Sequence, residues 1–135
     1  MSAPDSGLPP RIGVVDDDPS TCRAIARLLR AAGFRAETFA SAEAFLEARR
    51  EEGFTCLVLD IHLPGLSGPD LGRYLAKGPS SPPIVFITAH EDPPTREHAR
   101  QSGGVACLSK PFRGQHLINA IVNAVQRHPT QAPQS

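Results

Sequence analysis

Five short apolar runs are spaced along the chain and separated by segments with helical periodicity. Each run is four to six residues long, and they are Arg11 to Asp16, Arg35 to Phe39, Thr55 to Asp60, Pro83 to Thr88 and Val105 to Leu108. Apolar runs this short, bounded by turn residues, are typical of buried strands and not of helices. The sequence therefore predicts five strands.

The first segment between the runs has the features of an amphipathic helix. Asp18 is a suitable N-cap and Pro19 then occupies the first helical position. An apolar stripe follows, ending before Gly33, and it consists of Cys22, Ile25, Leu28, Leu29 and Ala32. This pattern predicts a helix from Pro19 to the residue before Gly33.

Four more helices are predicted in the remaining segments. Ser41 can cap a second helix with Glu43 in its first turn. Two others are expected at Ser67 to Lys77 and Thr95 to Gln101, and the last is indicated by the spacing of Leu117, Ile118, Ile121, Val122 and Val125. Strands that alternate with helices predict an α/β fold with a parallel sheet covered on both faces.

Length and composition limit what the chain can be. A chain of 135 residues has room for one domain, placed at residues 11 to 127, and the Pro-, Ser- and Gln-rich ends 1 to 10 and 128 to 135 are expected to be disordered. The 14 Lys and Arg residues balance the 14 Asp and Glu residues, so no net field favours nucleic acid or an anionic membrane. We expect neither as a direct partner.

Cysteine usage and hydropathy indicate a soluble protein of a reducing cytosol. The three cysteines are odd in number and lie apart, at Cys22, Cys56 and Cys107. The sequence contains no apolar run near the ~18 residues of a membrane span. A cytoplasmic location is therefore expected.

Polar residues end or follow the predicted strands. Asp16 and Asp17 end the first strand, Asp60 the third and Thr88 the fourth, while Lys110 follows the fifth. Parallel strands place their carboxyl ends at one edge, where such sheets bind ligands. Three carboxylates crowded there would raise one another's pKa values unless a hard divalent cation, Mg²⁺ or Mn²⁺, lies between them.

Asp60 is the candidate for the reacting group, because it ends the central strand. A carboxylate can attack phosphorus directly and form an acyl phosphate. The Lys110 ammonium would neutralise charge on the phosphoryl oxygens, and the Thr88 hydroxyl would donate to one of them. The pattern thus indicates phosphoryl transfer.

Five motifs in this order resemble those of a known family: Val14-Val15-Asp16-Asp17-Asp18, Leu57-Val58-Leu59-Asp60, Leu63-Pro64-Gly65-Leu66-Ser67-Gly68, Ile87-Thr88-Ala89 and Ser109-Lys110-Pro111-Phe112. They are similar to the motifs of response-regulator receiver domains over about residues 11 to 127, most of all to receivers of LuxR-type regulators. The resemblance implies a (βα)5 doubly wound, flavodoxin-like fold with strand order 2-1-3-4-5.

The resemblance also implies roles for individual residues. Asp60 would be the phosphoacceptor and, with Asp17, a direct metal ligand. Asp16 would act through a metal-bound water, and the main-chain carbonyl of His62 would be a further ligand. The bond between Lys110 and Pro111 would be cis, which proline permits.

The implied function is signalling, not enzymatic turnover. A sensor histidine kinase or a phosphotransfer protein would supply the phosphoryl group, and autodephosphorylation would be slow. A downstream protein would bind the face formed by the fourth helix, fifth strand and fifth helix. Because no DNA-binding region follows the receiver motifs, a single-domain regulator is expected.

Three positions depart from the family pattern or vary within it. Cys107 stands where receivers usually have Tyr or Phe, three residues before the lysine, so the usual coupling of Thr88 to a moving ring is in doubt. His62 and His90 occupy two positions that tune phosphoryl lifetime in the family. They predict an autodephosphorylation rate that depends on pH between about 6 and 8.

Other functions remain open at this point. A receiver-like scaffold with phosphorylation-independent output is compatible with Cys107. An aspartyl-phosphate phosphatase would typically carry a second aspartate two residues after Asp60, where this chain has His62. A flavin-binding protein of similar topology would need a phosphate loop after the first strand, and the sequence has no such Gly/Ser/Thr-rich segment.

Overall fold

Five parallel strands form one sheet in the computed structural model, which describes residues 9–48, 53–78, 81–89 and 92–127. The strands are β1 (Arg11–Val15), β2 (Arg35–Phe39), β3 (Cys56–Asp60), β4 (Ile84–Thr88) and β5 (Gly104–Ser109). Their spatial order is β2-β1-β3-β4-β5. The predicted α/β class and strand order are confirmed. Of the two ends predicted to be disordered, only Pro9 and Pro10 lie within the described residues.

The first four helices along the chain begin where a side chain accepts one of their first N–H groups. The helices are α1 (Pro19–Ala31), α2 (Ala42–Ala48), α3 (Gly68–Ala76), α4 (Pro93–Gln101) and α5 (Gly114–Arg127). Asp18 caps α1 as predicted, because its side chain accepts from the Ser20 N–H. Helix α4 begins two residues before the predicted Thr95, since Asp92 is its cap and prolines are tolerated in the first turn.

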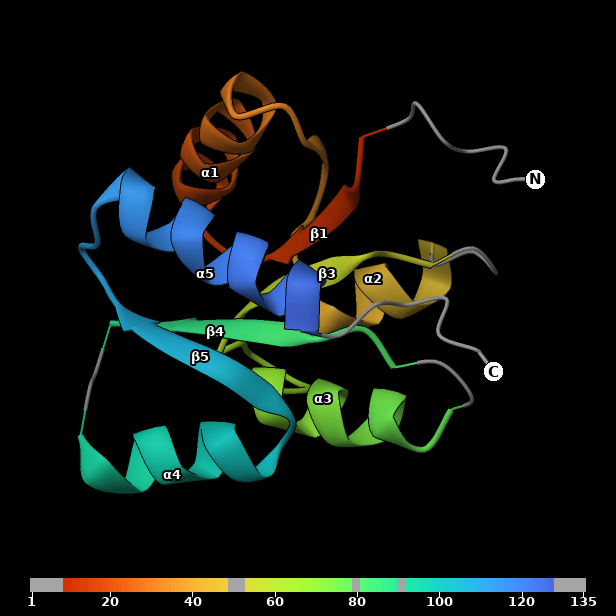
Figure 1. Cartoon of the computed structure of the whole chain (residues 1–135). Coiled ribbons are helices and arrows are strands. Elements are labelled where there is room, and N and C mark those ends of the chain that lie inside the picture. Colours follow the sequence, from red (N-terminus) through yellow and green to blue (C-terminus); the bar gives the residue numbers. More distant parts are fainter. Residues whose placement is uncertain (1–8, 49–52, 79–80, 90–91, 128–135) are drawn as a thin grey trace.

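Two helical layers cover the sheet (Figure 1). Helices α1 and α5 pack on one face, where Ile25, Leu29, Leu117 and Ile121 join the core. Helices α2, α3 and α4 pack on the other face through residues that include Phe45, Leu71 and Ala99. All five residues of the central strand β3 are buried, so the residue that ends this strand is held by an enclosed part of the fold.

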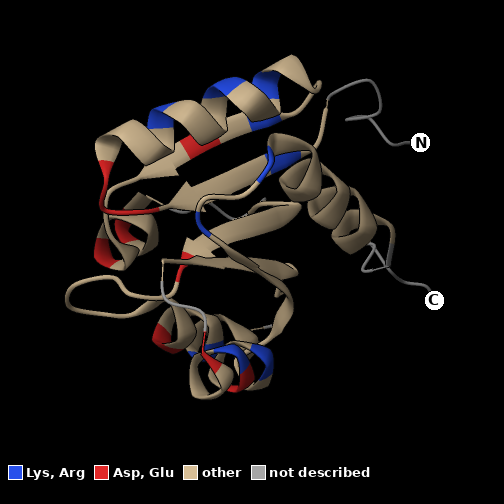
Figure 2. Cartoon of the chain, turned by 90° about the vertical axis from the view of Figure 1, so that its left-hand side faces the viewer, with Lys and Arg blue, Asp and Glu red and all other residues tan. Residues whose placement is uncertain are grey.

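The carboxyl ends of all five strands point to the same edge of the sheet. Asp60 is paired in register with Ile87, one residue before the end of β4. Figure 2 views the molecule from this edge, and acidic segments of separate loops face the viewer there.

None of the helices in the described ranges combines the length and the apolar character that a bilayer span requires.

Candidate functional site

Three carboxylates meet at the carboxyl edge of the sheet. Asp16 and Asp17 follow β1, and Asp60 ends β3; each offers an oxygen, and these oxygens all lie within 4.8 Å of one another. Asp16 and Asp60 are buried, with exposed fractions of 1% and 6%, whereas Asp17 is exposed. The arrangement agrees with the expectation that parallel strands bring these residues together.

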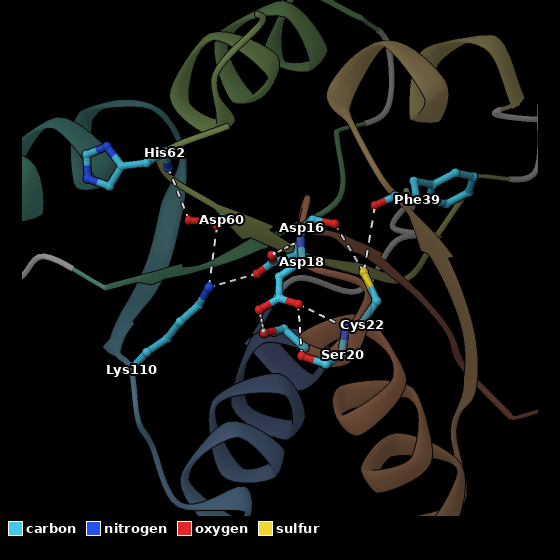
Figure 3. A network of polar contacts seen from close by, with 9 residues as sticks. Asp16, Asp18, Ser20, Cys22, Phe39, Asp60, His62 and Lys110 are labelled. Atoms are coloured by element: carbon cyan, nitrogen blue, oxygen red, sulfur yellow. Dashed lines mark hydrogen bonds and ion pairs between the residues drawn. The ribbon is translucent and has the colours of Figure 1, made fainter. Parts of the chain in front are cut away.

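Lys110 reaches into the acidic cluster from the end of β5 (Figure 3). Its Nζ lies 2.9 Å from Asp16 Oδ2 and 3.4 Å from Asp60 Oδ2. Its main-chain N–H donates to the Thr88 carbonyl at 2.7 Å, which ties the lysine to the end of β4. Thr88 itself is fully buried. The Lys110–Pro111 bond is cis, as the resemblance implies.

Main-chain groups orient both buried carboxylates. The Asp18 N–H donates to Asp16 Oδ1 at 2.9 Å, and the His62 N–H donates to Asp60 Oδ1 at 3.1 Å. The Cys22 thiol of α1 donates to the main-chain carbonyl of Asp16 at 3.2 Å. Each carboxylate therefore has one oxygen bound by a nearby N–H and the other beside the lysine.

Three further positions, His62, His90 and Cys107, depart from the family pattern or vary within it. His62 is exposed, and in Figure 3 its imidazole ring points away from Asp60. His90 lies outside the described residues. Cys107 is partly buried in β5, packs against the α2–α3–α4 side of the core and is paired in register with Phe86. The tuning role of the two histidines stays a prediction.

Burial, hydrogen bonds and the charges of the cluster together shift the pKa values of Asp60 and Lys110. Burial raises the pKa of Asp60, and the Asp16 charge raises it further, while the His62 N–H and Lys110 act against the shift. Burial alone would lower the pKa of Lys110, but its hydrogen bonds and charge interactions with Asp16 and Asp60 raise it. One ammonium thus leaves the negative charge of the cluster incompletely compensated.

The stability of the metal-free protein should reflect the raised pKa of Asp60. Folding favours the protonated carboxyl, so this stabilisation is complete below the ordinary value of 3.8 and is lost as the pH rises through the folded-state pKa. Asp60→Asn, which cannot ionise, should therefore be more stable than the wild type at about pH 7, with the difference vanishing toward about pH 4. Urea unfolding in EDTA at several pH values measures this. An Asn variant no more stable than wild type at neutral pH would contradict it.

The donor set fits a hard divalent cation. All three side chains offer carboxylate oxygens, which are the ligands that Mg²⁺ and Mn²⁺ prefer, and no thiol or imidazole belongs to the cluster among the described residues. The exposed Asp17 leaves one side of the cluster open to solvent. The residues present can therefore hold the ion that the sequence predicts.

Some contacts of this site do not follow from the sequence pattern. The N–H of Asp18, the thiol of Cys22 and the carboxylate of Glu43 all contact the loops that carry the acidic residues. The sequence pattern indicates only a helix cap for Asp18 and only a place in an apolar stripe for Cys22. The Asp18 contact is local, since it joins residues two positions apart, but the Cys22 and Glu43 contacts depend on how α1 and α2 pack in the folded chain.

Comparison with known proteins gives the family. The model of the response regulator receiver domain matches residues 12–122. Nodulation protein W of Bradyrhizobium diazoefficiens is 44% identical over 114 residues, covering 84% of this chain and 50% of that protein. Response regulator protein TmoT of Ectopseudomonas mendocina is 39% identical over 126 residues, covering 91% of this chain and 57% of that protein.

A solved structure agrees with these matches. Response regulator StyR superposes with a TM-score of 0.79 at 47% identity, covering 88% of this chain and 60% of that chain. The chain spans about half the length of the curated relatives it matches. Sequence, topology and the acidic site at the strand ends agree, and the chain belongs to the response regulator receiver domain family.

Proposed function

We propose that Asp60 accepts a phosphoryl group from a sensor histidine kinase or a phosphotransfer protein. The observation that carries this proposal is the position of Asp60, which ends the buried central strand with Asp16 and Asp17 oxygens within 4.8 Å and the Lys110 ammonium 3.4 Å away. Receiver-domain proteins are generally signalling proteins and not enzymes. The phosphorylated chain would then relay the signal by protein–protein contact.

Each side chain has a task in this transfer. One Asp60 oxygen forms a bond to phosphorus, while the bond from phosphorus to the donor nitrogen breaks and its electron pair stays on the donor. Lys110 is placed to neutralise a phosphoryl oxygen, because its Nζ already lies beside Asp60 Oδ2. Thr88, at the end of the neighbouring strand, would donate its hydroxyl to another oxygen.

The metal would be held by Asp17, Asp60 and the main-chain carbonyl of His62, with Asp16 bound through water. Bound Mg²⁺ or Mn²⁺ supplies positive charge that offsets the charge of the phosphoryl oxygens. The Asp18 and His62 N–H groups would hold the carboxylates in place, since each already binds one carboxylate oxygen. These assignments are supported by the oxygen-only donor set.

Incubation with acetyl phosphate and Mg²⁺, followed by intact-mass analysis, tests the proposal. The wild type should gain one phosphoryl group, and Asp60→Asn should gain none. Asp70→Asn is the matched control, because it removes an aspartate on α3 that pairs with Arg73 outside the cluster. A phosphoryl group on the Asp60→Asn variant, or none on the wild type, would refute the assignment.

We propose further that the readout of phosphorylation is atypical. The downstream target would bind the face formed by α4, β5 and α5, where Cys107 replaces the usual aromatic residue. A thiol is much smaller than an aromatic ring and cannot fill the space into which a ring would move, so α4 should move little on activation. Crystals of the free and beryllofluoride-bound protein measure this displacement, and a full-sized shift of α4 would contradict the expectation.

The same observation favours one alternative function. A receiver-like scaffold would bind partners without phosphorylation, and Cys107 is the feature that supports it. Amide NMR shifts with beryllofluoride and Mg²⁺ separate the two functions, because only a phosphorylation-dependent receiver should respond beyond the acidic site. A single-domain regulator stays a prediction, since the curated relatives are about twice as long as the region they share with this chain.

A further inference from the structure

The loop at residues 61–67, between β3 and α3, folds back onto Asp60. At its base, the Gly68 N–H donates to the Ile61 carbonyl at 3.3 Å. Near its start, the His62 N–H donates to Asp60 Oδ1 at 3.1 Å. Leu63 is buried in the core. The orientation of the Asp60 carboxylate therefore depends on the path of this loop.

The far end of the loop is held by a residue from a different part of the chain. Glu43, in the first turn of α2, accepts the Leu66 N–H on Oε2 at 2.9 Å. This hydrogen bond lowers the pKa of the Glu43 carboxyl. The contact joins α2, which contributes no residue to the acidic cluster, to the loop that follows Asp60.

Gly65 provides the room for this contact. Its φ of +75° lies in the left-handed region that glycine adopts readily, and a Cβ at this position would lie 2.7 Å from Glu43 Oε2. A side chain would therefore both strain the turn and displace the carboxylate. The absence of a side chain at Gly65 and the acceptor at Glu43 are complementary.

We propose that Glu43 is a positioning residue of the acidic site. It fixes the end of the loop through Leu66, and the loop in turn holds the His62 main chain against Asp60. For phosphorylation the inference rests on the proposed function, but its effect on loop order and metal affinity does not. Within the described residues, Glu43 makes no hydrogen bond or ion pair with Asp16, Asp17 or Asp60.

A simpler account of Glu43 makes different predictions. An acidic residue in the first turn of a helix interacts favourably with the helix dipole through its charge. That account predicts that Gln and Ala at position 43 behave alike, since both remove the charge. Positioning predicts that Gln retains the function, because its amide oxygen can still accept the Leu66 N–H.

The experiment compares Glu43→Ala and Glu43→Gln with the control Glu47→Ala, which removes an equal charge from the same helix one turn later. NMR measures exchange of the Leu66 and His62 amides in metal-free protein, and calorimetry measures the Mg²⁺ Kd. Glu43→Ala should speed both exchange rates and weaken Mg²⁺ binding about tenfold, the lower end of the loss for an outer-shell partner, because Glu43 acts on the ligands only through the loop. Glu43→Gln and Glu47→Ala should stay within about twofold of wild type on the same scale.

The inference is overturned if Glu43→Ala matches Glu47→Ala in exchange and affinity, or if Glu43→Gln is as impaired as Glu43→Ala. Parallel acetyl phosphate assays keep the two proposals apart. A wild type that gains no phosphoryl group refutes the proposed function alone, since amide exchange and Mg²⁺ affinity still decide the role of Glu43. Normal phosphorylation of wild type with unchanged Glu43→Ala exchange and affinity refutes the positioning role alone.

Discussion

Replacing Lys110 by methionine is expected to slow the phosphorylation of Asp60 by acetyl phosphate by about 10²-fold, the usual loss when one donor to a developing anion is removed. The Lys110 Nζ lies 2.9 Å from Asp16 and 3.4 Å from Asp60, so the ammonium already stands beside the carboxylate that would receive the phosphoryl group. Methionine keeps the unbranched stem but has no charge and no N–H donor. The variant therefore separates the ammonium from its packing.

The loss of Lys110 should also change the free protein. Without the ammonium, the buried carboxylates of Asp16 and Asp60 repel each other without compensation, and the pKa of Asp60 rises further. The expected consequence is lower stability in EDTA at neutral pH, recovered in part at acidic pH where the carboxyl is protonated. Binding of Mg²⁺ should therefore stabilise the Lys110→Met variant more than it stabilises the wild type.

Intact-mass time courses at saturating Mg²⁺ measure the effect of Lys110→Met on phosphorylation. Lys77→Met is the matched control, because Lys77 is an exposed residue at the end of α3 and makes no contact with the cluster in the described part of the chain. Its rate should equal that of wild type. A Lys110→Met rate within about threefold of wild type, instead of the ~10²-fold loss expected, would show that Lys110 does not stabilise the phosphoryl group during transfer.

The core of this site could be predicted because it follows from topology. Strands that run parallel must end at one edge, so the sequence predicts that Asp16 and Asp60 meet there, and the structure brings their carboxylates together. Lys110 follows from the same reasoning, since it comes directly after the last strand. The strand bounds differ by at most one residue from the predicted runs, and β2 agrees at both ends.

Contacts between loops and helices could not be predicted in this way. The hydrogen bond from Leu66 to Glu43 joins residues 23 positions apart, and neither belongs to a strand. The Cys22 thiol reaches the Asp16 carbonyl only because α1 packs against the end of β1. Such contacts depend on the packing of whole elements, which neither periodicity nor capping rules describe.

Gly68 shows how closely the main chain is packed behind the phosphoacceptor. A Cβ built at this glycine would lie 2.2 Å from the Asp60 carbonyl oxygen, 3.1 Å from its carbonyl carbon and 3.2 Å from Ile61 Cα. All three are backbone atoms, so no side chain can rotate away to relieve the contact. An added methyl group must therefore push α3 away from the end of β3.

Gly68→Ala is accordingly expected to destabilise the protein by about 3 kcal/mol, the upper end of the usual range for overpacking. The displaced helix should also weaken the bond from the Gly68 N–H to Ile61, and with it the base of the loop that holds the His62 main chain on Asp60. Loss of stability and loss of Mg²⁺ affinity should therefore appear together in this variant.

Urea unfolding and Mg²⁺ calorimetry at a temperature where the variant remains folded measure both effects of Gly68→Ala. Gly78→Ala is the control, because among the described residues a Cβ there would meet only the Leu75 carbonyl oxygen, at an ordinary 3.4 Å. It should leave stability within about 0.5 kcal/mol of wild type, as other surface substitutions do. If Gly68→Ala were equally mild, α3 could shift without moving Asp60, and the packing behind the phosphoacceptor would not constrain the site.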